Sequence, residues 1–363
     1  MFKRLKGFGL WVVSCLLVLS FVLSACSEYI DTTPSSVSLA ASAAAIEPTP
    51  VPATMVKANP VVNQTPLPVP ASVRSNVAAP APAKPVLNTP VAIISNDQIA
   101  GGLDYNSGFY GFPYANSSFY IHMPPAPKAG HALQIIMAIH GMGGNGADFG
   151  QPLISYADEY GFVLVAPTMQ YDPDYTDPAR VAANDEVLLP ELHSLVQALP
   201  GVIGYPVSQQ VMLFGFSRGA QIVHRFALFY PEQVKGVALM SAGSYTLPYQ
   251  DYKPTDNGAK TVLRFPFGVA DLAKFTGHNF DMQAFRKVPF WIGVGGADNA
   301  TKDVPQAWNS YLGETRVERA TRFYQALQKS GINATFNIFP GIGHTVCTDM
   351  KRDGFAFFNK LLG

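Results

Sequence analysis

Short apolar runs alternate with longer amphipathic segments along residues 94–363. The runs Leu133–His140 and Phe162–Ala166 are apolar at nearly every position, which is typical of strands covered on both faces. Ser117–His122 comes before them and is expected to be an edge strand. The other predicted strands are Gln210–Phe214, Val234–Met240, Pro289–Val294 and Ala334–Phe339.

Segments with helical spacing separate these strands. Between residues 184 and 199, Leu188, Leu192 and Leu195 recur at the spacing of one helix face. The alternation of strands and helices predicts an α/β fold in which a mostly parallel central sheet is flanked by helices. The predicted helices are Phe149–Tyr160, Asn184–Leu199, Ala220–Phe229, Arg316–Ser330 and Asp349–Leu362.

The N-terminal segment has a different pattern. Three basic residues precede the apolar run Phe8–Leu23, which is the layout of a secretory signal and is short for a membrane-spanning anchor helix. The string Leu23–Cys26 (LSAC) resembles the lipobox of bacterial lipoproteins, in which the cysteine is lipidated. This resemblance implies a signal peptide over residues 1–25 and lipidation of Cys26. It also implies an extracytoplasmic protein anchored to a bacterial cell membrane through that lipid.

Residues 26–93 are expected to form a disordered tether. Twelve prolines occur between Asp31 and Ile93, with no aromatic residue and no glycine. Such a segment buries too little apolar surface to offset the entropy lost on ordering. A single globular domain is therefore predicted over residues 94–363.

Composition and charge exclude several classes of function. The chain of 363 residues carries 25 basic and 25 acidic side chains and has a formal net charge of zero. That balance provides no basic surface for a nucleic-acid partner. Three cysteines are too few for a disulfide framework. The aspartates of the YDPDYTDP segment, residues 171–178, lack the spacing of a calcium loop, so neither a metal nor a cofactor is expected.

The string Gly215–Gly219 (GFSRG) lies between a predicted strand and a predicted helix. This is the context of a G-x-S-x-G nucleophile elbow, in which a sharp turn exposes the serine at the carboxyl edge of the sheet. Ser217 is therefore the candidate nucleophile.

A serine nucleophile needs a base and an orienting carboxylate, which follow it along the chain in this kind of site. Asp298 follows the strand Pro289–Val294, and His344 follows the strand Ala334–Phe339. Both are expected on loops at the same sheet edge as Ser217. Asp303 is the alternative for the acid.

A glycine-rich loop, His140–Gly146 (HGMGGNG), follows the predicted strand Leu133–His140. Loops of this kind supply backbone N–H groups to an oxyanion hole. From its spacing Met142 is the preferred donor, with Gly143 as the alternate. Arg218, directly after the nucleophile, is expected to donate the other N–H. His140 itself is interpreted as structural.

The motifs HGMGGNG, GFSRG, GGAD and GIGH occur in this order and at the ends of four predicted strands. In this respect the region 94–363 resembles the α/β-hydrolase superfamily. More narrowly, it is similar to secreted esterases of the polyhydroxybutyrate-depolymerase-like and feruloyl-esterase-like kinds. The resemblance implies hydrolysis of a small or polymeric ester through an acyl-enzyme, in which Ser217 attacks, His344 transfers the proton and Asp298 orients His344.

Residues 244–288 lie where this fold often carries a cap, and a small cap insertion is expected there. Eight aromatic residues of this segment could form a wall or lid for an apolar group, or the core of an inserted subdomain. Both interpretations stay open at this stage. The eight are Tyr245, Tyr249, Tyr252, Phe265, Phe267, Phe275, Phe280 and Phe285.

Two other functions share this scaffold. A serine peptidase of the prolyl-oligopeptidase type would use the same catalytic residues, but no propeller-like domain precedes residue 94. A non-catalytic binding protein would not need the nucleophile, base, acid and oxyanion loop together. Both alternatives are less favoured than an esterase.

Overall fold

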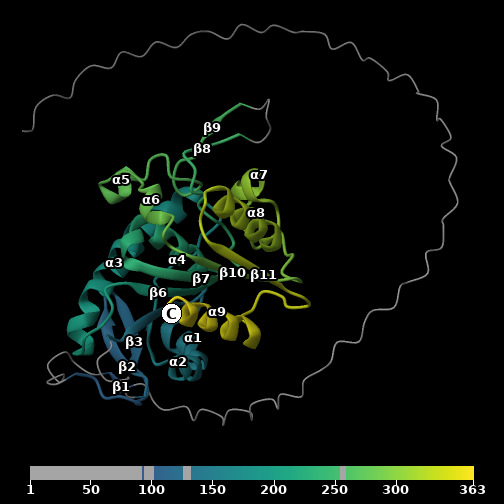
Figure 1. Ribbon diagram of the computed structural model, residues 1–363. Coiled ribbons are helices and arrows are strands. Elements are labelled where there is room, and N and C mark those ends of the chain that lie inside the picture. Colours follow the sequence, from purple (N-terminus) through teal and green to yellow (C-terminus); the bar gives the residue numbers. More distant parts are fainter. Residues whose placement is uncertain (1–91, 94–101, 126–131, 254–258) are drawn as a thin grey trace, which may run out of the picture. The chain divides into compact units, whose positions relative to one another are not determined.

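The computed structural model describes residues 92–93, 102–125, 132–253 and 259–363, and Figure 1 shows their arrangement. The expected signal peptide over 1–25 and the lipidation site Cys26 lie outside the described residues. So does the expected tether over 26–93, apart from its last two residues. Those two residues, Ala92 and Ile93, pair in parallel with Tyr110 and Gly111, so strand pairing begins just before the predicted start of the domain at 94.

In the described part of the chain, nine strands form one sheet in the order β1-β2-β3-β5-β4-β6-β7-β10-β11. Strand β3 is antiparallel to both of its neighbours, whereas every other pairing in the sheet is parallel. The strands are β1 (Ala92–Ile93), β2 (Tyr110–Tyr114), β3 (Ser117–His122), β4 (Gln134–Ile139), β5 (Phe162–Pro167), β6 (Val211–Phe216), β7 (Val234–Met240), β10 (Phe290–Gly295) and β11 (Ala334–Phe339). A separate ribbon pairs β8 (Asp251–Tyr252) with β9 (Thr261–Val262).

Helices cover both faces of the sheet. Figure 1 shows α1, α2 and α9 on one side and α3, α4 and α8 on the other. Among the described residues, no helix has the length and apolar character needed to cross a bilayer. The helices are α1 (Gly146–Gly150), α2 (Ile154–Tyr160), α3 (Pro178–Ile203), α4 (Arg218–Phe229), α5 (Ala273–Thr276), α6 (Met282–Phe285), α7 (Asn309–Leu312), α8 (Arg316–Lys329) and α9 (Thr348–Lys360).

The period of two along each strand divides the core into two clusters. In β6, Leu213 packs in the cluster under α3, α4 and α8, while Phe214 packs in the cluster under α1, α2 and α9. The strands read as continuous apolar runs because both faces are buried in this way. The predicted mostly parallel sheet with flanking helices is confirmed.

Strand Ser117–His122 is present as predicted, but its expected position at the sheet edge is wrong. Residues 110–114 form a further strand, β2, outside it. No strand was predicted for this segment, which contains Gly111 and Pro113. Strand β1 pairs only with its first two residues, Tyr110 and Gly111. On that side Pro113 has no partner strand, so its missing N–H removes no ladder hydrogen bond.

Two helices differ in extent from the prediction. The helix expected over Phe149–Tyr160 is divided into α1 and α2 by a 3-10 turn, Gln151–Leu153, which contains Pro152. Helix α3 is longer than Asn184–Leu199. It begins after the N-cap Asp177, whose side chain accepts from the N–H of Ala179, and it continues through two internal prolines.

The aromatic side chains of 244–288 contribute to the main core on the α4 and α8 side. Tyr245 is fully buried and stacks on Phe323 of α8, with ring centroids 4.4 Å apart. Phe265 packs edge-on against Phe229 of α4. Of the two interpretations, the structure therefore favours core packing for these buried rings over a wall for a ligand.

Candidate active site

Ser217 occupies a strained turn between β6 and α4. Its backbone has φ 54° and ψ −115°, a conformation that residues other than glycine rarely adopt. The flanking glycines permit this turn: a Cβ on Gly215 would lie 2.6 Å from the oxygen of Gly219, and one on Gly219 would overlap the carbonyl oxygen of Ile139. The Ser217 N–H donates to the oxygen of Met240 at 2.9 Å, which fixes the elbow to β7.

The structure brings Ser217, His344 and Asp298 into one hydrogen-bonded chain. His344 Nε2 lies 3.0 Å from Ser217 Oγ, and His344 Nδ1 lies 2.8 Å from Asp298 Oδ2. A carboxylate can only accept, so Nδ1 carries the proton and Nε2 is free to accept from the serine hydroxyl. This is the geometry that nucleophile, base and acid require.

Asp298 is buried beside two groups that favour its ionised form. Burial alone would raise its pKa, but the hydrogen bond and charge of His344 and the charge of Arg316 together hold the pKa below its usual value. Arg316 Nη1 lies 3.2 Å from Asp298 Oδ1, the carboxylate oxygen that His344 does not use. Asp298 is thus a charged, oriented acceptor.

Asp303, the alternative acid, does not reach His344. Its Oδ2 lies 3.2 Å from Nη1 of Arg316, the same nitrogen that bonds Asp298. The side chain of Asp303 is 47% exposed, whereas that of Asp298 is 1% exposed. Of the two candidates, only Asp298 is placed to orient the imidazole.

Two backbone segments meet beside Ser217. The Arg218 N–H is in the first turn of α4, where no intrahelical acceptor is available. On the other side, a Cβ on Gly141 would lie 3.2 Å from Ser217 Cβ, so this loop passes directly against the serine. The N–H of Gly144 donates to the oxygen of Gly141. Within the described residues, the N–H groups of Met142 and Gly143 have no acceptor, so either can serve an oxyanion.

His140 is 1% exposed and holds the glycine-rich loop in shape, as the structural interpretation expected. Its Nε2 accepts from the N–H of Met169 at 2.9 Å, so the ring proton is on Nδ1, which donates to the oxygen of Gly141 at 2.7 Å. Burial lowers the pKa of His140, which keeps the ring neutral. The imidazole therefore ties the loop to the segment that follows β5.

Sequence reasoning missed three residues that surround the site: Tyr171, Asp185 and Arg316. Asp185 carried a usable signal, because it falls on the same helix face as the apolar residues Leu188 and Leu192. A carboxylate on an apolar face needs a buried cation, and Arg218 of the nucleophile motif and Arg225 both pair with it.

The aspartates of residues 171–178 have local roles. Asp172 pairs with Arg180, Asp174 accepts from Thr176, and Asp177 caps α3. In the ranges that the structure describes, no group of three or more histidine, cysteine or acidic residues could hold a metal ion.

A cleft of about 500 Å³ lies away from these residues, at the amino ends of β6, β7 and β10. Ser217, Asp298 and His344 lie at the carboxyl ends of parallel strands, which is the opposite edge of the sheet. The cleft is therefore no part of the candidate site. It is lined by Gln210, Pro231, Glu232, Val234, Lys235, Ala284, Lys287, Pro289 and Leu361.

Comparison with known sequences gives a partial match. The sequence profile of the Ndr family matches residues 172–260, a segment that contains Ser217 and ends before Asp298 and His344. Protein NDRG2 of Bos taurus is 22% identical over 205 residues, which are 55% of this chain and 54% of that protein. The chain thus spans about half the length of this curated relative.

Comparison with solved structures identifies the fold. Poly(aspartic acid) hydrolase-1 from Sphingomonas sp. KT-1 is 18% identical, with a TM-score of 0.51, over 71% of this chain and 99% of that one. An S-formylglutathione hydrolase from Agrobacterium tumefaciens is 15% identical, with a TM-score of 0.45, over 73% of this chain and 100% of that one. Est1E from Butyrivibrio proteoclasticus is 15% identical, with a TM-score of 0.43, over 70% and 99%.

The chain has the α/β-hydrolase fold, as the sequence motifs predicted. At such low sequence identity, structural similarity supports the fold alone. The chemistry has to be argued from the residues described above.

Proposed function

We propose that this protein is a serine hydrolase that cleaves carboxylic esters through an acyl-enzyme. The observation that carries the proposal is the hydrogen-bonded chain from Asp298 through His344 to Ser217. It lies beside backbone N–H groups that have no other acceptor in the described residues. Chemistry by a serine nucleophile needs these groups together, and a scaffold protein without turnover does not.

The geometry supports the following reaction. Ser217 Oγ attacks the ester carbonyl carbon while His344 Nε2 takes the hydroxyl proton, and Asp298 stabilises the resulting imidazolium. The N–H of Arg218 and that of Met142 or Gly143 then donate to the oxyanion of the tetrahedral intermediate. When the intermediate collapses, His344 returns the proton to the departing alcohol. Water, activated by His344, hydrolyses the acyl-enzyme and releases the acid.

The proposed substrate is a polyester or an aryl ester, in line with the resemblance to polyhydroxybutyrate-depolymerase-like and feruloyl-esterase-like enzymes. The His344 side chain is 30% exposed, so the base can be reached from solvent. A domain held away from the membrane by lipidated Cys26 and the tether over 26–93 would reach such substrates outside the cytoplasm. Cys26→Ser is expected to release the protein from the membrane fraction, and unchanged fractionation would argue against the anchor.

Two alternatives use the same scaffold. A peptidase would cleave amides with the same triad, and poly(aspartic acid) hydrolase-1, named for a polymer, shares the fold. A binding protein would show no turnover, and the Ndr match over 172–260 covers Ser217 but neither Asp298 nor His344. A binding role leaves the hydrogen-bonded triad and the free N–H groups without a use, whereas a peptidase would use both, so the substrate test decides between ester and amide.

The test is hydrolysis of p-nitrophenyl esters from acetate to palmitate by the full chain, beside the Ser217→Ala variant. The expected result is turnover that disappears with Ser217, with a loss of roughly 10⁶-fold in kcat. The preferred acyl length would define the substrate pocket. Turnover that survives Ser217→Ala would refute the assignment, and turnover of amides alone would favour the peptidase.

A further inference from the structure

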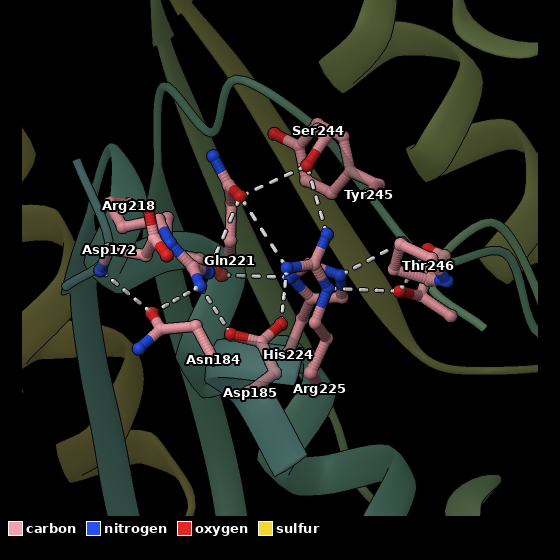
Figure 2. Close-up of polar contacts among 12 residues, drawn as sticks. Asp172, Asn184, Asp185, Arg218, Gln221, His224, Arg225, Ser244, Tyr245 and Thr246 are labelled. Carbon is pink, nitrogen blue, oxygen red and sulfur yellow. Dashed lines mark hydrogen bonds and ion pairs between the residues drawn. The ribbon is translucent and has the colours of Figure 1, made fainter. Parts of the chain in front are cut away.

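A buried polar cluster lies beneath the amino end of α4, and the reaction described above uses none of its side chains (Figure 2). Asp185 of α3 is fully buried, and its two carboxylate oxygens accept hydrogen bonds from Arg218 and Arg225 of α4. Arg225 also donates to the hydroxyls of Ser244 and Thr246, in the segment that follows β7. These contacts join α3, α4 and the end of β7 in a region without access to water.

Arg218 has two separate tasks in this arrangement. Its backbone N–H is a candidate oxyanion donor, and its guanidinium is an anchor. The side chain is 3% exposed and bonds Asp185, Asn184 and Gln221. The backbone N–H is positioned by the start of α4, and the guanidinium contacts help to anchor that end of the helix against α3.

Tyr171, in the segment after β5, contacts both sides of the candidate oxyanion hole. The Arg218 guanidinium lies over its ring, 5.3 Å from the centroid. Its hydroxyl donates to the backbone oxygen of His140 at 2.7 Å. Burial raises the pKa of this hydroxyl, so the group remains protonated and acts as a donor. Tyr171 thus contacts Arg218, whose backbone N–H is one candidate donor. It also contacts His140, which begins the loop that carries the other candidate donor.

The other contacts of the loop at this point involve its backbone and the His140 ring, and Gly219 of α4 packs closely against the His140 oxygen. The His140 ring fixes the oxygen of Gly141, and Gly144 closes a turn on the same oxygen. Only the Tyr171 hydroxyl, among the described residues, bonds the His140 backbone oxygen from a side chain. Tyr171 is thus the described side chain that links the start of the loop to Arg218 at the start of α4, in addition to the backbone contacts between them.

We propose that Tyr171 is a positioning residue that fixes the distance between the two halves of the oxyanion hole. The inference rests on the proposed function, since it requires an oxyanion to form at Ser217. Tyr171 does not touch the reacting atoms and acts through His140 and Arg218.

The expected consequence falls on kcat rather than on KM. The oxyanion contacts are made in the transition state, so loosening them removes transition-state binding and leaves the ground state nearly unchanged. Complete loss of one donor costs about 10²–10³-fold, and a displacement of about 1 Å can cost about 10²-fold. Loss of the Tyr171 hydroxyl alone, with the ring kept, should cost roughly 10-fold.

The experiment compares Tyr171→Phe with Tyr249→Phe in the full chain. Tyr249 is the matched control, because its half-buried hydroxyl also donates to a backbone oxygen, that of Ala326, at 3.1 Å. Both variants keep the ring and lose one such hydrogen bond, so similar melting temperatures are expected. With a p-nitrophenyl ester, Tyr171→Phe should lower kcat roughly 10-fold at nearly unchanged KM, whereas Tyr249→Phe should leave both constants unchanged.

An alkylboronic acid gives a second readout, because its serine adduct is tetrahedral and places an oxygen in the oxyanion hole. Its inhibition constant should rise in Tyr171→Phe by about the factor lost in kcat. Equal kcat values for the two variants, or an effect confined to KM, would overturn the positioning role while the hydrolase proposal stands. Absence of serine-dependent turnover in the wild-type chain would overturn both.

Discussion

Two arginine–carboxylate clusters lie behind the candidate site, and they differ in how they meet solvent. Behind the candidate oxyanion donors, one carboxylate, Asp185, is shared by two guanidiniums, and all three side chains are 0–3% exposed. Behind His344, one guanidinium, Arg316, is shared by two carboxylates. Of these, Asp298 is buried and Asp303 is 47% exposed. One cluster is closed, and the other is open at one end.

This difference predicts different roles. In the closed cluster, water cannot replace a lost partner, so removal of one charge leaves another buried and unpaired. Its main contribution is therefore to stability and to the fixed position of α4. In the open cluster, water can solvate Asp303. The main electrostatic effect of Arg316 is therefore on Asp298, whose pKa it helps to lower. That cluster should govern the protonation and orientation of Asp298 and His344 more than the folding of the domain.

The largest expected effect tests the open cluster. Asp298→Asn should lower kcat by roughly 10⁴-fold, because an amide in place of the carboxylate favours the wrong tautomer of His344. Asp303→Asn is the matched control: it removes a carboxylate from the same guanidinium and should leave kcat within a few-fold of wild type. Ester hydrolysis at neutral pH measures both. The opposite order of effects would transfer the acid's role to Asp303.

The next effect tests the closed cluster. Asp185→Asn should lower the free energy of unfolding by about 3–5 kcal/mol, because Arg218 and Arg225 lose their shared counter-ion in the protein interior. Asp172→Asn is the control, since Asp172 pairs with Arg180 in a solvent-accessible ion pair, and such pairs contribute little to stability. Urea unfolding of both variants measures the difference. Equal losses would mean that burial does not separate the two pairs.

The smallest effect concerns pH and Arg316. The pKa of Asp298 is lowered in the folded protein, so this group contributes stability that is present above its unfolded pKa of about 3.9. That contribution is lost as the pH falls through the lower, folded value. Arg316→Gln should reduce it, so the difference in melting temperature from wild type should be largest near pH 7 and should shrink below about pH 4.

The Asp298→Asn background provides the control for this pH effect. In that background, Arg316→Gln should lower the melting temperature only through the lost contact with Asp303. The difference from the wild-type background gives the contribution that depends on Asp298. A cost that does not change from pH 7 to pH 2 would show that Arg316 supports the fold without acting through either carboxylate. Melting curves across this range measure it.

The strand ends that carry the site could be predicted because each strand is a buried apolar run. Val234–Met240 and Ala334–Phe339 have the bounds predicted from the sequence, and β6 and β10 are displaced by only one or two residues. Parallel strands in that order place Ser217, Asp298 and His344 at one edge. The order of motifs along the chain therefore led to the hydrogen-bonded arrangement.

The contacts behind the site could not be predicted in the same way. The partners of Arg218 and Arg225 are 33 and 40 residues away in the sequence, on another helix. Arg316 was expected only as the start of a helix, and its side chain reaches back 18 residues to Asp298. Such pairs depend on how helices cross the sheet, which the hydrophobic pattern does not determine. The choice between the Met142 and Gly143 N–H groups as the loop donor also stays open. A glycine-rich loop has no pattern of apolar and polar side chains from which its backbone conformation could be predicted.

The backbone of Ser217, at φ 54° and ψ −115°, has a consequence for anyone who evolves this protein in the laboratory. A residue other than glycine held in such a conformation costs about 1–3 kcal/mol, so Ser217→Gly should relax the chain. A library sorted for heat resistance alone would enrich this inactive glycine variant. A library sorted for turnover would keep the serine and accept a lower melting temperature.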